Sequence, residues 1–260
     1  MTERKKAVGN LIMLIGTLLI NWLGGCGQIN NYSQKEVSDK YSTLITPSPE
    51  TFSIWGIIYM FLIISIILMI IKSNDLQYKK IINAITSKFW IASLFSIFWI
   101  ISFSYLQLKL PVLFIFGLLI SLLLILKNIE AFSTQKIILL PITFGLYAGW
   151  IFIATVVNIS ATLVKLKWNR FYLSENFWAS LTLIVAVILI YLITLKIKNA
   201  VFFLPIAWAF YGIQSSNVLT NQYMILKYIA SVGAVALIII AIYQFYKNDY
   251  SFIPNNKRSY

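Results

Sequence analysis

One apolar segment of the chain, long enough to cross a bilayer, carries Tyr147, Trp150 and Asn158. At about 100° per residue, these side chains share one helical face with Thr143 and Ala154, within an arc of about 80°. Phenol, indole and amide groups on a single face can stack on a flat molecule and form hydrogen bonds with its polar atoms. The pattern favours a ligand pocket, and packing of this face against a neighbouring helix is the alternative.

The sequence lacks the side chains on which most enzymes and metalloproteins rely. It contains no histidine and a single cysteine, Cys26. Histidine is the commonest general base and a common ligand of haem and zinc, and one cysteine cannot form an intrachain disulfide. Glu36, Asp39 and Glu50 have no catalytic partner that the sequence identifies. We therefore expect no enzyme, no catalytic residue, no metal site and no required cofactor.

The composition is that of a membrane protein. Of the 260 residues, 60% are hydrophobic and 11% are charged, whereas about a quarter of the residues of a soluble domain are charged. The mean hydropathy is +0.82. A helix of about 20 mostly apolar residues crosses the hydrocarbon core, which is about 30 Å thick. The chain has room for about eight such helices.

We predict an all-α membrane protein with about eight transmembrane helices. The expected spans are residues 7–26, 52–72, 89–106, 110–127, 137–164, 176–196, 200–217 and 224–246, of which the fourth and seventh are short. The helices that carry the polar face are therefore expected to lie inside the membrane, where they can position it around a cavity.

The distribution of charge predicts the topology. The 21 Lys and Arg residues and 8 Asp and Glu residues give a net charge of +13. With the N-terminus inside, the predicted loops place fourteen basic residues in the cytoplasm, Lys136, Lys257 and Arg258 among them, and seven outside. This asymmetry is the positive-inside pattern and predicts cytoplasmic termini. The basic residues then indicate topology and attraction to anionic lipid, and we expect no nucleic-acid partner.

The longest polar segment, residues 27–51, follows the first predicted helix. It has no obvious secondary-structure element of its own, and loops of this length often serve as lids. A plain tether is the alternative. The preceding residues have a basic start, an apolar run and Leu-Gly-Gly before Cys26, which resembles a lipoprotein signal peptide. Because the apolar run is long and more spans follow, we interpret residues 7–26 as a retained helix.

Other spans place aromatic or amide side chains toward the same outer side of the membrane. The predicted topology puts Asn21 at the outer end of the first helix, Trp55 at the start of the second and Trp99 in the outer half of the third. Together with the face of Trp150 and Asn158, they predict a pocket beneath the 27–51 loop. An aromatic belt at the membrane interface is the alternative, combined with close helix packing through small residues.

These residues resemble the TspO/translocator protein family, also called tryptophan-rich sensory proteins. The stretch LYAGWIFIATVVN is similar to the fifth-helix motif of the family, which reads roughly PYLAWxxFAxxLN, so Tyr147, Trp150, Ala154 and Asn158 fall on its Tyr, Trp, Ala and Asn. In the second-helix motif Trp and Tyr are four residues apart, as in PSPETFSIWGIIY. The third-helix pattern Asn-x-x-Trp-Ser appears as Ser96, Trp99 and Ile100, with serine in place of asparagine and isoleucine in place of serine.

The resemblance covers about residues 1–165 and implies a five-helix bundle whose pocket is closed by the loop after the first helix. It implies two regions, a TspO-like domain at 1–170 with the lid at 27–51 and a three-helix extension at 171–260. The expected ligand-binding residues are Asn21, Trp55, Tyr59, Ser96, Trp99, Tyr147, Trp150, Ala154 and Asn158.

The resemblance also implies a function: a receptor or sensor that binds a flat apolar molecule such as a tetrapyrrole. Because the chain has no histidine to ligate haem iron, a metal-free porphyrin is the preferred ligand. The alternatives are a transporter of tetrapyrroles or other hydrophobic molecules and, by resemblance only, an enzyme that degrades porphyrin. The expected partners are the bilayer and the small-molecule ligand, with a homodimer left open. The expected location is the bacterial cytoplasmic membrane.

Overall fold

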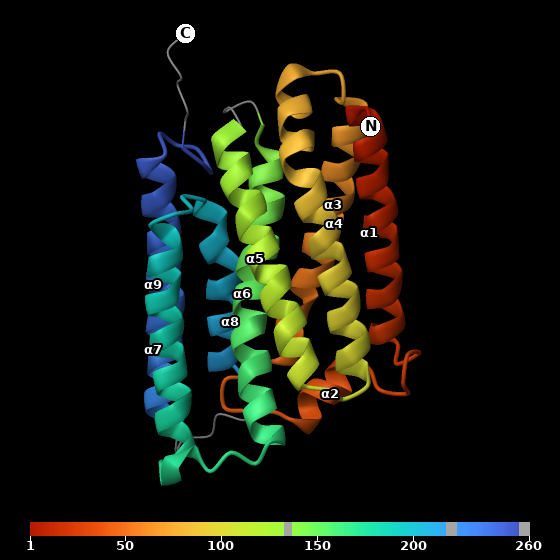
Figure 1. The fold of residues 1–260 in the computed structure, drawn as a ribbon. Helices are drawn as coiled ribbons and strands as arrows, with labels where there is room; N and C mark the ends of the chain where they lie inside the picture. Colours follow the sequence, from red (N-terminus) through yellow and green to blue (C-terminus); the bar gives the residue numbers. More distant parts are fainter. Residues whose placement is uncertain (133–136, 217–222, 255–260) are drawn as a thin grey trace.

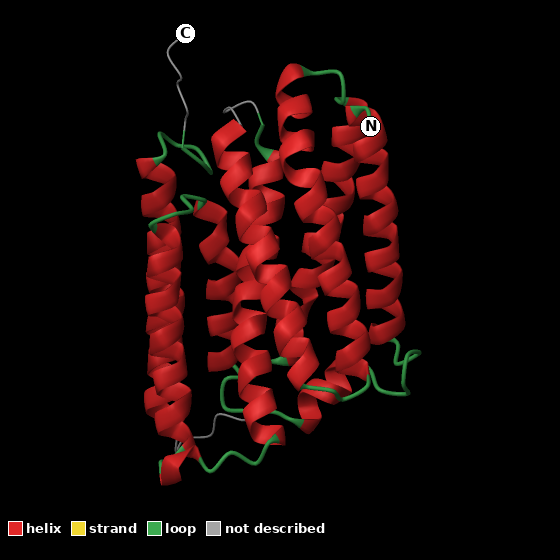
Figure 2. Ribbon diagram, in the orientation of Figure 1, coloured by secondary structure: helices red, strands yellow, loops and turns green. Residues whose placement is uncertain are grey.

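The computed structural model describes residues 1–132, 137–216 and 223–254 (Figure 1). Over these ranges all regular structure is helical, with nine α-helices and three short 3₁₀ helices (Figure 2). Lys136, Lys257 and Arg258, which the topology prediction counts as cytoplasmic, and position 217 of the predicted seventh span lie outside the described residues.

The helices follow one another along the chain with short connections. They are α1 (Glu3–Gly25), α2 (Gln34–Lys40), η1 (Pro49–Ser53), α3 (Ile54–Ile71), α4 (Leu76–Ser104), α5 (Lys109–Phe132), α6 (Leu139–Lys165), η2 (Arg170–Tyr172), α7 (Glu175–Thr194), η3 (Ala200–Phe202), α8 (Phe203–Gln214) and α9 (Met224–Lys247).

The all-α membrane fold is confirmed. Seven helical segments in the described part are long and apolar enough to cross a membrane, and the predicted seventh span, 200–217, corresponds to the shorter apolar stretch Ala200–Gln214. At 1.5 Å per residue, this stretch extends about 22 Å, less than the hydrocarbon thickness. Two predicted boundaries were wrong: the third helix begins at Leu76 rather than at residue 89, and the fourth has 24 residues and is not short.

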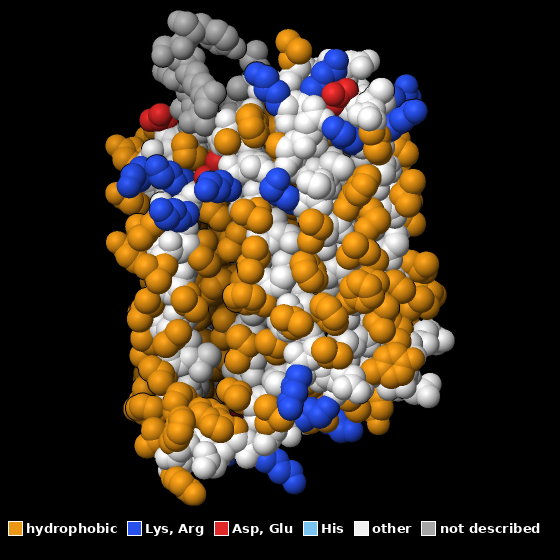
Figure 3. Space-filling view, viewed as in Figure 1, with side chains coloured by type: hydrophobic (Ala, Val, Ile, Leu, Met, Phe, Trp, Pro, Cys, Tyr) orange, Lys and Arg blue, Asp and Glu red, His pale blue; other side chains and the backbone are white. Residues whose placement is uncertain are grey.

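The first turn of α1 and the last turn of α9 lie at the same end of the bundle, which we call the terminal end (Figure 1). The opposite end, which carries α2, is called the lid end. Lys and Arg side chains gather at both ends, and hydrophobic side chains cover the surface between them (Figure 3). This pattern fits a bilayer around the middle of the bundle. The cytoplasmic location of the terminal end stays a prediction.

Helices α1, α3, α4, α5 and α6 pack into one bundle, in which α4 contacts α1 and α5, and α6 contacts α3 and α5. A few polar contacts link them inside the apolar core. Trp90 Nε1 donates to Asn10 Oδ1 at 2.9 Å, and the hydroxyls of Ser65 and Thr143 lie 2.6 Å apart. Because a buried polar group without a partner is costly, such pairs favour one relative placement of the helices.

The C-terminal helices attach to this bundle through two glycines of α6. A Cβ added at Gly145 would lie 2.5 Å from Asn199 Oδ1, and one added at Gly149 would lie 2.1 Å from the backbone oxygen of Phe202. The glycines therefore let η3 approach the α6 backbone, as small residues do between membrane helices. Asn199 Nδ2 also donates to the Pro141 carbonyl at 2.9 Å. The division into two domains at residue 170 stays a prediction.

The 27–51 segment contains secondary structure, so the expectation of a loop without its own element was wrong. Ser33 and Glu36 form a capping box at the start of α2, with Glu36 N donating to Ser33 Oγ and Ser33 N donating to Glu36 Oε2. The reciprocal bonds satisfy two backbone donors at the helix start. The backbone hydrogen bond from Ser33 also lowers the pKa of the Glu36 carboxyl.

Helix α8 holds the far end of this segment in a contact that we call the lid clamp. Ser48 N donates to the Gly212 carbonyl and Trp208 Nε1 donates to the Thr51 carbonyl, both at 2.9 Å. A Cβ at Gly212 would lie 2.0 Å from Thr51 Oγ1, so only glycine allows this approach. The loop between α1 and α3 is thus fastened by a helix about 160 residues later in the chain.

Candidate functional site

Five aromatic rings meet inside the bundle near the lid end, and we call them the aromatic cluster: Trp55, Tyr59, Trp99, Tyr147 and Trp150. Trp55 lies at the centre. Its ring stacks on Tyr59 with centroids 5.1 Å apart and lies 6.1 to 6.2 Å from the other three rings. Three helices, α3, α4 and α6, therefore present their rings to one point, as the shared face of α6 predicted.

Amide side chains orient the rings of the cluster. Trp99 Nε1 donates to Asn158 Oδ1 at 3.2 Å, and the Asn158 amide donates to the Ala154 carbonyl one turn earlier in α6. Tyr59 OH donates to Asn21 Oδ1 at 2.8 Å, which joins α3 to α1. Each buried amide thus has its oxygen occupied by an aromatic donor, and the ring orientations are fixed by hydrogen bonds as well as by packing.

Three rings of the cluster, those of Trp55, Trp99 and Trp150, border a small cavity of about 60 Å³, the aromatic cavity, which the lid covers. Five of the predicted binding residues line it: Trp55, Trp99, Trp150, Ala154 and Asn158. The other four stand behind this wall. Tyr59 stacks on Trp55 and donates to Asn21 of α1, and the buried Ser96 is hydrogen-bonded to Tyr147. The structure brings all nine together, and their role in binding stays a prediction.

The indole N–H of Trp150 is the unusual group at this site. The side chain is 3% exposed, and Nε1 has no hydrogen-bond acceptor among the described residues. The indoles of Trp90, Trp99, Trp178 and Trp208 all donate to protein oxygens. A buried donor without an acceptor costs about 1–3 kcal/mol. The wall of the aromatic cavity therefore carries a donor for which the protein supplies no partner.

Ten further residues line the aromatic cavity, and the sequence analysis did not name them as site residues. They are Gln34, Ser38, Tyr41, Thr46, Pro47, Phe52, Phe103, Ile153, Val157 and Ala161. Phe103 follows Trp99 by four residues and shares its face of α4, so helical periodicity could have identified it. Phe52 lies edge-on to Trp150, with ring centroids 5.9 Å apart. Phe52 is the first residue of the predicted second span, 52–72, and no sequence pattern pointed to that contact.

The fold and the site together define a class of protein: an integral membrane protein whose apolar helices enclose a cavity walled by indole rings and covered by a helical lid. The model of the family described as TSPO-like protein matches residues 7–243. The chain belongs to this family, and the match extends past residue 165, the limit of the resemblance in the sequence, into the C-terminal helices. The comparisons with curated proteins and with solved structures give no match.

Proposed function

We propose that the chain is a TspO-type membrane receptor or sensor that binds a flat, largely apolar molecule, such as a metal-free tetrapyrrole, in the aromatic cavity. In this proposal the cavity has no catalytic role and requires no metal or cofactor. Membership of the TSPO-like family supports the proposal. So does the meeting of four rings around Trp55, because aromatic faces stack well on a planar ligand.

The observation that carries the proposal is the unpaired Trp150 N–H. A ligand that brings a carboxylate, carbonyl or ring nitrogen to this point would satisfy the donor and recover part of its burial cost. The neighbouring Asn158 amide is already engaged with Trp99 and Ala154. Trp150 Nε1 is thus a buried donor, on a residue of the wall, that a ligand with an acceptor would satisfy.

The size of the cavity sets a condition on binding. Pockets for small molecules usually measure about 300–1,000 Å³, and the aromatic cavity measures about 60 Å³. Lid residues such as Tyr41 and Pro47 line the cavity, and Phe52 lies edge-on to Trp150 from η1, which continues the lid. Displacement of the lid and η1 would therefore enlarge the space. The proposal therefore assigns the structure to a closed state, and ligand uptake to an open one.

The test is binding of metal-free protoporphyrin to the purified full chain, followed by the Soret absorbance of the porphyrin so that tryptophan replacement leaves the probe unchanged. Trp150→Phe keeps a ring and removes the N–H, and we expect about fivefold to tenfold weaker binding. Ala154→Leu fills the cavity and should weaken binding further. Trp22→Phe is the matched control, because Trp22 is exposed on α1.

Equal affinity in the wild type, Trp150→Phe and Ala154→Leu would show that porphyrin does not occupy this cavity. A second measurement separates receptor from transporter. Sealed proteoliposomes that contain the protein should bind porphyrin without accumulating it in their lumen. Concentrative uptake would favour the transporter.

A further inference from the structure

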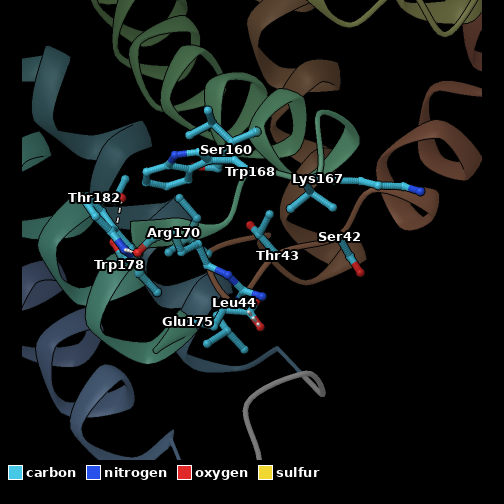
Figure 4. A pocket seen from close by; sticks show the side chains of 14 residues that line it. Ser42, Thr43, Leu44, Ser160, Lys167, Trp168, Arg170, Glu175, Trp178 and Thr182 are labelled. Atoms are coloured by element: carbon cyan, nitrogen blue, oxygen red, sulfur yellow. Dashed lines mark hydrogen bonds and ion pairs between the residues drawn. The ribbon is translucent and has the colours of Figure 1, made fainter. Parts of the chain in front are cut away.

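A second and larger cavity lies at the lid end, where α6 ends and α7 begins. It measures about 550 Å³ and is bounded by the lid segment 42–45, the last turns of α6 and the first turns of α7. We call it the interface cavity. Figure 4 shows Trp168, Trp178, Arg170 and Glu175 around it. None of its lining residues belongs to the aromatic cluster.

The walls of the interface cavity combine a charged floor with apolar sides. Arg170 Nη1 lies 3.2 Å from Glu175 Oε2, and both side chains are 44% exposed. Lys167 stands on the rim and points away from the indole rings (Figure 4). The lining thus includes two cations and one carboxylate, so the surroundings carry a net positive charge. Leu163 and Ala179 provide apolar wall on the side of the two helices.

The arginine is held in place from its backbone. Trp178 Nε1 donates to the Arg170 carbonyl at 2.7 Å, and the rings of Trp168 and Trp178 lie 4.7 Å apart, edge to face. This pair of indoles sits beside the connection that follows the last residue of α6, Lys165. Tryptophan prefers the boundary between lipid and water. The Arg170 guanidinium therefore lies at the depth of the lipid head groups, outside the hydrocarbon core.

The cavity also has access to lipid between the two helices. Helix α7 packs mainly on α9 and meets α6 at few points. Apolar side chains along this margin are about half exposed, including Val164, Leu173 and Phe177. An acyl chain can lie against this surface while its head group reaches the arginine. A small hydrophilic anion would leave the apolar part of the cavity unfilled.

We propose that the interface cavity is a binding site for a membrane phospholipid with a net negative head group. The phosphate accepts hydrogen bonds from the Arg170 guanidinium, whose planar donors suit phosphate oxygens. Lys167 adds positive potential at the rim, and the acyl chain packs on Leu163, Val164 and Ala179. Glu175 competes with the phosphate for Arg170, so the carboxylate tunes the affinity. The site is independent of the tetrapyrrole proposal.

The test is native mass spectrometry of the detergent-solubilised full chain, titrated with phosphatidylglycerol, phosphatidylcholine or inorganic phosphate. We expect one phosphatidylglycerol to bind at least fivefold more tightly than phosphatidylcholine. Arg170→Gln should weaken phosphatidylglycerol binding about tenfold, the loss of one charge-assisted hydrogen bond. Glu175→Gln should strengthen it severalfold, because it leaves Arg170 without a competing carboxylate. Lys109→Gln, at an exposed cation outside the cavity, should change nothing.

The opposite signs of the two variants separate binding from structure. Both Arg170→Gln and Glu175→Gln break the same ion pair, so a purely structural role would move lipid binding in the same direction in both. That result would overturn the proposal. So would equal binding of the two lipids, displacement of phosphatidylglycerol by inorganic phosphate, or its displacement by stoichiometric protoporphyrin, which would assign the cavity to a free anion or to the porphyrin.

Discussion

The two cavities at the lid end differ in nearly every property. The aromatic cavity is about 60 Å³, lies under the lid and has a wall of aromatic, aliphatic and uncharged polar side chains, whereas the interface cavity is about 550 Å³ and carries a partly exposed ion pair. The smaller one contains the buried donor without an acceptor. The volume of a cavity depends on how closely the neighbouring helices pack. A buried polar group without a partner, in contrast, indicates that a partner from outside the protein can bind there. The smaller cavity therefore gives the stronger indication of a specific ligand.

The cavities also depend on different contacts. The lid that covers the aromatic cavity is fastened by α8 through Ser48, Thr51 and Gly212. The interface cavity lies where α6 and α7 make few contacts, and the connection between them contributes Lys167, Trp168 and Arg170 to its lining. Lid residues 42–45 border the interface cavity as well, but the groups assigned to the phosphate, Lys167 and Arg170, lie on the connection between α6 and α7. A change in the lid clamp should therefore affect the aromatic cavity more strongly than lipid binding at the interface cavity.

The largest effect is expected for Gly212→Ala. Its added Cβ would lie 2.0 Å from Thr51 Oγ1, so η1 or α8 has to move. Overpacking of this kind lowers the free energy of unfolding by about 2 kcal/mol. We expect a lower Tm and faster hydrogen exchange in residues 43–53, with phosphatidylglycerol binding retained.

The matched control is Gly56→Ala in α3, where an added Cβ meets nothing within 4 Å. It replaces the same residue type in another apolar helix and should leave the Tm and the exchange of the lid unchanged. If both substitutions had equal effects, the close approach of Gly212 to Thr51 would not be what fastens the lid.

A smaller effect is expected for Trp208→Phe. This change removes the hydrogen bond to the Thr51 carbonyl, worth about 1 kcal/mol, and keeps an aromatic ring beside Tyr211. The lid should open more often, so protoporphyrin should associate several times faster in stopped-flow measurements. An unchanged association rate would mean that lid opening does not limit access to the aromatic cavity.

The smallest effect concerns pH. The Glu36 carboxyl has a pKa below its ordinary value of 4.5 because Ser33 N donates to it. Its stabilisation of α2 is therefore present above pH 4.5 and is lost as the pH falls through the lowered pKa. The protection factors of the α2 amides, which are corrected for the intrinsic pH dependence of hydrogen exchange, should fall in acid in the wild type. In Glu36→Gln this fall should disappear; if it persists, another group controls the lid helix.

The sequence was sufficient to predict the helical membrane fold and the convergence of the rings. The spans could be read because crossing lipid requires long apolar runs. The face of α6 could be read because a regular helix repeats every 3.6 residues, which aligned Tyr147, Trp150 and Asn158. The beginning of α4 at Leu76 was missed, because Lys79, Lys80 and Lys88 make it polar although it stays helical.

Other features were visible but not used, or required the three-dimensional structure. The sequence pattern of Ser33 and Glu36 is that of a capping box and marks a helix start. The prediction of a loop at residues 27–51 did not take this pattern into account, so α2 was not predicted. The contact of Trp208 with Thr51 joins residues 157 positions apart, so no local pattern reveals it. The interface cavity depends on positive φ angles at non-glycine residues, Lys167 and Arg170 among them, which residue type does not predict.

The lid clamp has a consequence for how tightly any ligand can be measured to bind. If only a fraction of molecules has an open lid, the apparent Kd equals the intrinsic Kd divided by that fraction. A molecule that fits the rings well would then seem a weak ligand in equilibrium measurements. Loosening Ser48, Thr51 and Gly212 from one another would tighten apparent binding without altering any atom that touches the ligand. The contact with α8 thereby controls the apparent affinity of the aromatic cavity, although none of the residues that line this cavity belongs to the C-terminal helices.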